Sequence, residues 1–184
     1  MITNFLKNTN EKFERNVINI NKKNLLSKAK EDTEFQEIIK DIIENKEVQK
    51  MKNYTVHGNT TCFSHCYTVS YLCYLSCKKH GLDYKSAARA GMLHDFYLYN
   101  WRIKNSHIRP HAFTHPLTSY LNAKKHFDLN WLEKDMILTH MWPVTLFTIP
   151  LSPEGWILTM IDKNCATIEF FDSLKLKIKK AVHA

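Results

Sequence analysis

The stretch from Ala87 to Asp95 limits what this chain can fold into more than any other part of it. Up to Leu93 the residues are small or apolar except for one arginine, and no proline interrupts them, so the pattern predicts the end of a buried helix. His94 and Asp95 follow directly. An isolated pair of this kind is most simply a helix-capping aspartate beside a hydrogen-bonded histidine. Because an unpaired buried carboxylate is costly, the pair needs a partner, which the rest of the chain must supply.

Further helices are predicted around this stretch from the spacing of apolar residues and from turn residues, at 62–80, 113–126, 129–141 and from Ser152 onward. Gly81 lies where a helix commonly ends, and Ser152-Pro153 has the serine and proline that favour a helix start. No alternating strand pattern of useful length occurs between them. The sequence therefore predicts an all-α fold.

The chain divides into three parts. Residues 1–56 are rich in Asn and Lys, contain a clear helix start at Asp32, and predict an N-terminal helical extension that packs on the core. Residues 57–172 predict the core, and residues 173–184 a basic C-terminal tail. Half of the formal net charge of +8 lies in that tail, in four lysines without an acid. Charge alone therefore gives no reason to expect a nucleic-acid partner.

The cysteines and the hydropathy pattern indicate a cytoplasmic location. Cys62, Cys66, Cys73 and Cys77 share one helical face but extend along about 22 Å of helix, too far for one metal, so we expect small buried side chains. An odd total of five fits a reducing compartment. No stretch approaches the length of an apolar membrane span, and the N-terminus is too polar for a signal peptide. No membrane partner is expected.

Four histidines and two aspartates lie on inward faces or helix ends of the predicted core: His65, His94, Asp95, His115, His140 and Asp162. Each of them alone has an ordinary explanation, such as a hydrogen-bonded histidine in the core. Six in one small helical domain indicate a metal centre, because helical bundles build such centres from side chains that project inward from facing helices. Imidazole nitrogen and carboxylate oxygen both suit first-row divalent cations.

The order of these residues resembles that of the HD-domain superfamily of metal-dependent phosphohydrolases, which is named for a pair matched here by His94-Asp95. The first histidine, the two intermediate histidines and the closing aspartate of that family are matched by His65, His115, His140 and Asp162. The likeness covers about residues 57–170. It implies an HD-domain helical bundle with the metal site in its core, and two divalent metal ions, which could be Fe, Mn, Zn, Ni or Co.

The resemblance also implies roles. Asp95 would bridge the two ions, with His65, His94 and Asp162 on one and His115 and His140 on the other. A metal-activated water would cleave a small phosphorylated substrate, a nucleotide or another phosphomonoester or phosphoanhydride.

Further residues near the motifs are candidates for catalysis or for substrate binding. Lys163 is a candidate catalytic residue that contacts phosphate or an acidic group behind the ligands, or equally a solvated lysine. Arg102, Arg109 and Trp142 are candidates for substrate binding, with ordinary loop arginines and a core tryptophan as the alternatives. Trp101, like Trp142, could stack on a nucleobase or be an ordinary core residue, and His57, His107 and His111 are spare candidates for supporting the ligands.

Two other functions stay open at this stage. Some HD-fold proteins with the same ligand order look like di-iron oxygenases, which need iron and oxygen where hydrolysis needs only a divalent ion. A non-catalytic nucleotide-binding module is the third possibility, although the complete ligand set argues against it. The sequence predicts neither the substrate nor the oligomeric state.

Overall fold

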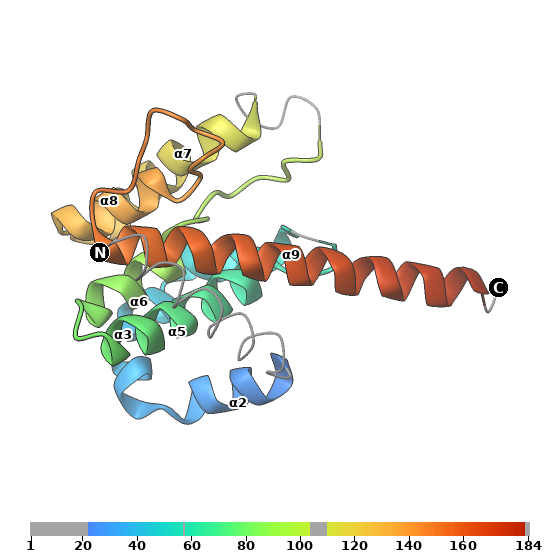
Figure 1. The fold of residues 1–184 in the computed structure, drawn as a ribbon, viewed down its shortest axis with the longest axis horizontal. Helices are drawn as coiled ribbons and strands as arrows, with labels where there is room; N and C mark the ends of the chain where they lie inside the picture. Colours follow the sequence, from blue (N-terminus) through green and yellow to red (C-terminus); the bar gives the residue numbers. More distant parts are fainter. Residues whose placement is uncertain (1–21, 57, 104–109, 183–184) are drawn as a thin grey trace.

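The structure, a computed structural model, describes residues 22–56, 58–103 and 110–182. Three candidate residues, His57, His107 and Arg109, lie outside these ranges. The predicted all-α fold is confirmed, and within the described residues the only strand-like pairing is an isolated bridge between Thr55 and Thr61. The elements, labelled in Figure 1, are α2 (Lys22–Glu31), α3 (Thr33–Glu44), α4 (Lys46–Gln49), the 3-10 helix η1 (Lys50–Asn53), α5 (Cys62–Lys79), α6 (Tyr84–Leu93), α7 (His111–His126), α8 (Trp131–Thr139) and α9 (Pro153–Val182).

The helices begin and end at the residues that the sequence marks. Thr61 caps α5, because its hydroxyl oxygen accepts a hydrogen bond from the Ser64 amide at 3.2 Å. Gly81 follows the end of α5 with φ +67°, a conformation that glycine adopts without strain. Ser152 accepts from the Gly155 amide at 3.0 Å at the start of α9.

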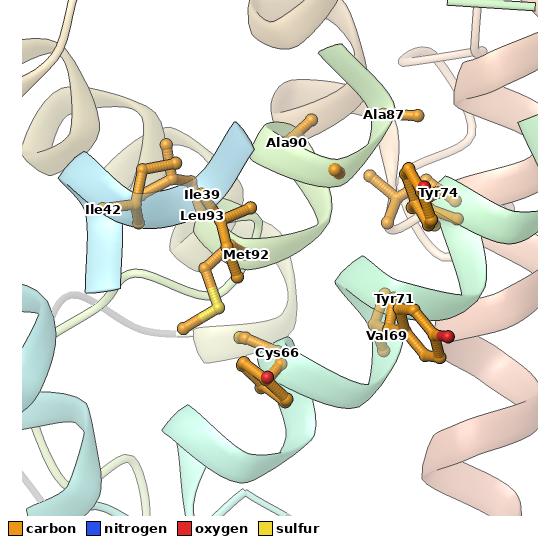
Figure 2. Packing of buried hydrophobic residues seen from close by; sticks show 14 of the residues in the cluster. Ile39, Ile42, Cys66, Val69, Tyr71, Tyr74, Ala87, Ala90, Met92 and Leu93 are labelled. Atoms are coloured by element: carbon orange, nitrogen blue, oxygen red, sulfur yellow. The ribbon is translucent and has the colours of Figure 1, made fainter. Parts of the chain in front are cut away.

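The core forms where α5 crosses α6 and where α3 covers both. Ile39 and Ile42 of α3 lie close to Met92 of α6 in Figure 2, and all three are fully buried. Helix α5 closely approaches α6 at Gly91, where an added Cβ would lie 2.7 Å from the Cα of Ser70. Only glycine allows this spacing, which brings His94 beside α5. All five cysteines are buried.

The described part of the N-terminal region packs on the core. Phe35 of α3 is fully buried, and its ring lies 4.9 Å from that of Tyr71 and 5.4 Å from that of Tyr74. The Gln36 side chain donates to the Tyr67 hydroxyl at 2.7 Å. These contacts hold α3 against α5.

Helix α9 crosses the molecule and then leaves it. Its first half packs on α5, α6 and α8, and its second half extends beyond all the other helices in Figure 1. The helix runs without a break through the boundary predicted at residues 172 and 173. Among the described helices, none is long and apolar enough to cross a membrane.

Candidate metal centre

Five segments bring the six predicted ligands together in the interior. His65 comes from α5, His115 from α7 and Asp162 from α9, while His94 and His140 directly follow the last turns of α6 and α8. Asp95 follows His94. All six side chains are buried, and the most exposed, Asp162, has a relative exposure of 6%.

Each histidine ring is held through its Nδ1 atom. The Nδ1 atoms of His94, His115 and His140 lie 2.8 to 2.9 Å from backbone carbonyl oxygens three or four residues earlier in the chain, namely those of Gly91, His111 and Ile137. A carbonyl oxygen only accepts, so these three Nδ1 atoms must carry the hydrogen. In a neutral ring the Nε2 atom is then left with a lone pair that can bind a cation.

The fourth ring, that of His65, has a different partner. Its Nδ1 atom lies 3.0 Å from Oε2 of Glu169, a buried carboxylate on α9. Its Nε2 atom lies 3.0 Å from Oδ1 of Asp162. The carboxylate of Glu169 therefore accepts the Nδ1 hydrogen of His65, as a backbone carbonyl does for each of the other three rings, but it carries a negative charge.

The Nε2 atoms and the aspartate oxygens form two adjoining groups. In one group, the Nε2 atoms of His115 and His140 lie 2.9 Å apart, and 3.2 and 3.6 Å from Oδ1 of Asp95. In the other, Nε2 of His94 lies 3.8 Å from Oδ2 of Asp95 and 3.5 Å from Oδ1 of Asp162. The two oxygens of Asp95 thus face different groups.

These atoms could hold a metal ion. Three overlapping sets each have their ligand atoms within 4.8 Å of one another: His65, His94 and Asp95; His94, His140 and Asp162; and Asp95, His115 and His140. Nitrogen and oxygen donors at this spacing can move onto a first-row cation at about 2.0 to 2.2 Å with small shifts. The donor set fits iron, manganese, zinc, nickel or cobalt.

The buried carboxylates of the centre favour the binding of positive charge. Burial disfavours the charged form of His65, but the carboxylates of Asp162 and Glu169 outweigh it and hold the pKa of the ring well above its usual 6.5. Burial lowers the pKa of His140 to about 4. The pKa of Asp162 is held well below its usual value although burial raises it, because Lys163, His65 and His94 favour the carboxylate. A divalent cation would supply the charge that protons on the rings otherwise bring.

Lys163 lies on the outer side of the centre. Its ammonium group donates to Oδ2 of Asp162 at 2.8 Å and to the backbone carbonyl of His140 at 3.0 Å. It therefore ties the end of α8 to α9 and orients Asp162 so that Oδ1 faces His65 and His94. A contact of Lys163 with substrate stays a prediction.

The predicted substrate-binding residues within the described chain are engaged elsewhere. The guanidinium of Arg102 donates to the carbonyls of Thr55 and Val56, both at 3.0 Å, and lies 4.5 Å above the ring of Trp101. Trp142 packs edge-on against Trp156, with ring centroids 4.7 Å apart. The third, Arg109, is outside the described residues. Their role in binding stays a prediction.

Three residues complete the surroundings of the ligands. The ring of His111 stacks on that of His115 at 4.6 Å. The sequence analysis missed Glu169, although it lies seven residues after Asp162 and hence on the same face of the helix. It also missed Tyr97, whose ring lies 5.8 Å from that of His115 and whose buried hydroxyl has no hydrogen-bond partner among the described residues.

Comparisons of the chain with protein-family models, curated proteins and solved structures find no match. The resemblance to the HD-domain superfamily therefore depends on the six residues and their order, and membership of that family stays a prediction.

Proposed function

We propose that this protein is a metal-dependent hydrolase that cleaves a phosphoester or phosphoanhydride of a small substrate, such as a nucleotide, with water as the nucleophile. The reaction class comes from the resemblance in ligand order. The requirement for a cation comes from one observation, the approach of the Nε2 atoms of His115 and His140 to 2.9 Å.

Two neutral rings cannot stably face each other in this way. Both Nδ1 atoms carry hydrogens that are donated to backbone carbonyls, so both Nε2 atoms of His115 and His140 present lone pairs. A proton between them is one remedy, but burial holds the pKa of His140 at about 4 and opposes its charging. With a divalent cation held by Asp95, His115 and His140, the two lone pairs would no longer repel each other.

The residues around the centre then have separate roles in holding a cation and in orienting its ligands. Asp95 presents one oxygen to each group of nitrogen atoms and would help to hold a cation at either group. Asp162 is oriented by Lys163, and His65 by Glu169. When bound, a divalent cation lowers the pKa of water towards neutrality and offsets the charge on a phosphoryl group. The burial of the centre limits competing solvent around the reacting group.

The test couples metal analysis to a phosphate-release screen. The purified protein should hold Fe, Mn, Zn, Ni or Co, and with Mn²⁺ it should release phosphate anaerobically from a nucleotide, dinucleoside polyphosphate or sugar phosphate. His94→Ala and Asp95→Ala should lose metal and activity while retaining most helicity. His126→Ala, an exposed histidine at the end of α7, is the matched control and should retain both.

Two outcomes would overturn the proposal. If His94→Ala and Asp95→Ala hold metal as tightly as the parent, the ligand set is wrong. If the protein holds iron, consumes oxygen with a substrate and releases no phosphate, the centre is that of an oxygenase and the proposed reaction is wrong.

A further inference from the structure

The second half of α9 exposes an unusual amount of apolar surface. Phe170 and Phe171 are 59% and 53% exposed, and Leu174 and Ile178 are 43% and 56% exposed. In Figure 1 the end of this helix extends away from the rest of the protein, whereas Ser173, near the start of the segment, is still buried against Gly58. None of the metal ligands lies on it, so the proposed reaction does not account for it.

The apolar residues form one stripe along the helix. At about 100° per residue, Phe170, Leu174, Ile178 and Phe171 cover an arc of about 100°. Lys177 lies beside one border of this arc and Lys175 beside the other, at about 20° and about 40° respectively. Leu176 is the exception, because it lies on the opposite, polar side although it is 52% exposed.

The charge of this segment has a single sign. After Asp172 the chain contains four lysines and no acidic residue: Lys175, Lys177, Lys179 and Lys180. The combination of an apolar stripe with lysines along both borders is the pattern of helices that lie in the interface of a bilayer. Clusters of four or more lysines on an amphipathic helix favour anionic phospholipid.

We propose that α9 from Phe170 onward is an interfacial helix that binds the protein to a surface of anionic phospholipid. The phenylalanines and the aliphatic residues enter the boundary between headgroups and acyl chains, and the lysines contact the phosphates. This proposal departs from the absence of a membrane partner expected from the sequence, because periodicity alone does not tell which apolar face of a long helix stays uncovered.

A second copy of the chain fits this face less well. In a pair of such helices the lysines that border one stripe would face those of the other, with no acid beyond Asp172 to pair with them. Four half-exposed side chains offer about 100 Å² each. A two-fold pair would bury about 800 Å², less than the about 1,000 Å² that a specific interface needs.

Cosedimentation of the full-length protein with vesicles tests the proposal. The protein should sediment with vesicles of phosphatidylcholine and phosphatidylserine and stay in solution with phosphatidylcholine alone. Replacing Lys175 or Lys177 with glutamine should each lower the partition coefficient about fivefold. The double variant Phe170→Gln/Leu174→Gln should abolish binding, whereas Leu176→Gln, which removes an equally exposed apolar residue from the polar side, should bind like the parent.

Light scattering coupled to size exclusion separates the alternatives. A monomer that binds only the anionic vesicles supports the proposal. A dimer that the double variant dissociates, with no vesicle binding, would overturn it in favour of self-association. Retention by double-stranded DNA or by RNA, without binding to vesicles, would overturn it in favour of a nucleic-acid partner. Circular dichroism of each variant should match that of the parent, since all the replaced residues are exposed.

Discussion

Replacing Glu169 with glutamine should weaken metal binding about tenfold. In the parent, the Nδ1 hydrogen of His65 is donated to a buried carboxylate 3.0 Å away. In the variant the acceptor becomes a neutral amide oxygen of the same size. The change makes His65 resemble His94, His115 and His140, whose Nδ1 atoms all face neutral carbonyls.

The magnitude follows from the difference between the two kinds of acceptor. A hydrogen bond to a charged group contributes about 1.5 to 3 kcal/mol and a neutral one about 0.5 to 1.5 kcal/mol. The difference of about 1 to 1.5 kcal/mol corresponds to a factor of about ten in affinity. Removing the acceptor altogether, as in Glu169→Ala, should weaken metal binding more, by about 100-fold, which is the upper end of the range expected when a partner of a metal ligand is lost.

Competition of the metal-free protein with a chromogenic chelator for Mn²⁺ would measure these affinities. The assay belongs at alkaline pH, because Glu169 also raises the pKa of His65 and so favours the proton that competes with the metal. At acidic pH the two effects of the substitution partly cancel, so the loss of affinity should be smaller there.

Glu133→Gln is the matched control. Glu133 is as buried as Glu169, and its oxygens accept from Arg89 at 2.8 Å and from the Asn130 amide at 2.9 Å, at the start of α8. Its replacement should lower stability and leave Mn²⁺ affinity unchanged. The reasoning is refuted if Glu169→Gln binds Mn²⁺ within twofold of the parent while His65→Ala loses most of the affinity.

Three further measurements test other features of the structure. The raised pKa of His65 contributes stability that is complete below its ordinary value of 6.5 and is lost as pH rises through the raised pKa of the folded state, so the Tm of the metal-free protein should fall as the pH rises above 6.5, and saturating Mn²⁺ should remove that fall. Gly91→Ala places a Cβ 2.7 Å from the Cα of Ser70 and should destabilise the fold by about 1 to 3 kcal/mol in urea titrations; an unchanged midpoint would contradict the close packing of α5 on α6. Tyr97→Phe removes a buried hydroxyl that has no partner among the described residues and should stabilise the metal-free protein by about 1 to 3 kcal/mol, whereas a lower Tm would reveal a partner.

Much of the fold is predictable from the sequence because the signals are local. The cap at Thr61, the left-handed Gly81 and the serine at 152 are short-range features that fix where helices begin and end. The inward faces of α5 and α9 follow from periodicity, and with them the positions of His65 and Asp162. The close approach at Gly91 is different, because it depends on α5, which is remote in the chain.

The contacts that support the ligands are also less predictable, because they depend on segments that are remote in the chain. Periodicity places Glu169 on the face of Asp162, but only the crossing of α9 over α5 shows that its carboxylate meets His65. The same holds for Arg102, whose donors bind the carbonyls of Thr55 and Val56 although sequence reasoning made it a candidate for substrate phosphate. A long, charged side chain can reach several partners, and the folded structure determines which of them it contacts.

The geometry of the predicted ligands links metal binding to the integrity of the fold. Helix α7 packs chiefly on α8 and only lightly on α6, so the packing of helices alone ties it weakly to the rest of the core. Yet His115 of α7 and His140 after α8 both point at Asp95, which belongs to the turn after α6. A cation bound there would join α7 to the turn after α6 through ligands, whereas α8 already packs on α6 and α9. Since binding to the folded state stabilises it by mass action, the cation that we propose to activate water would also stabilise the arrangement of its own ligands.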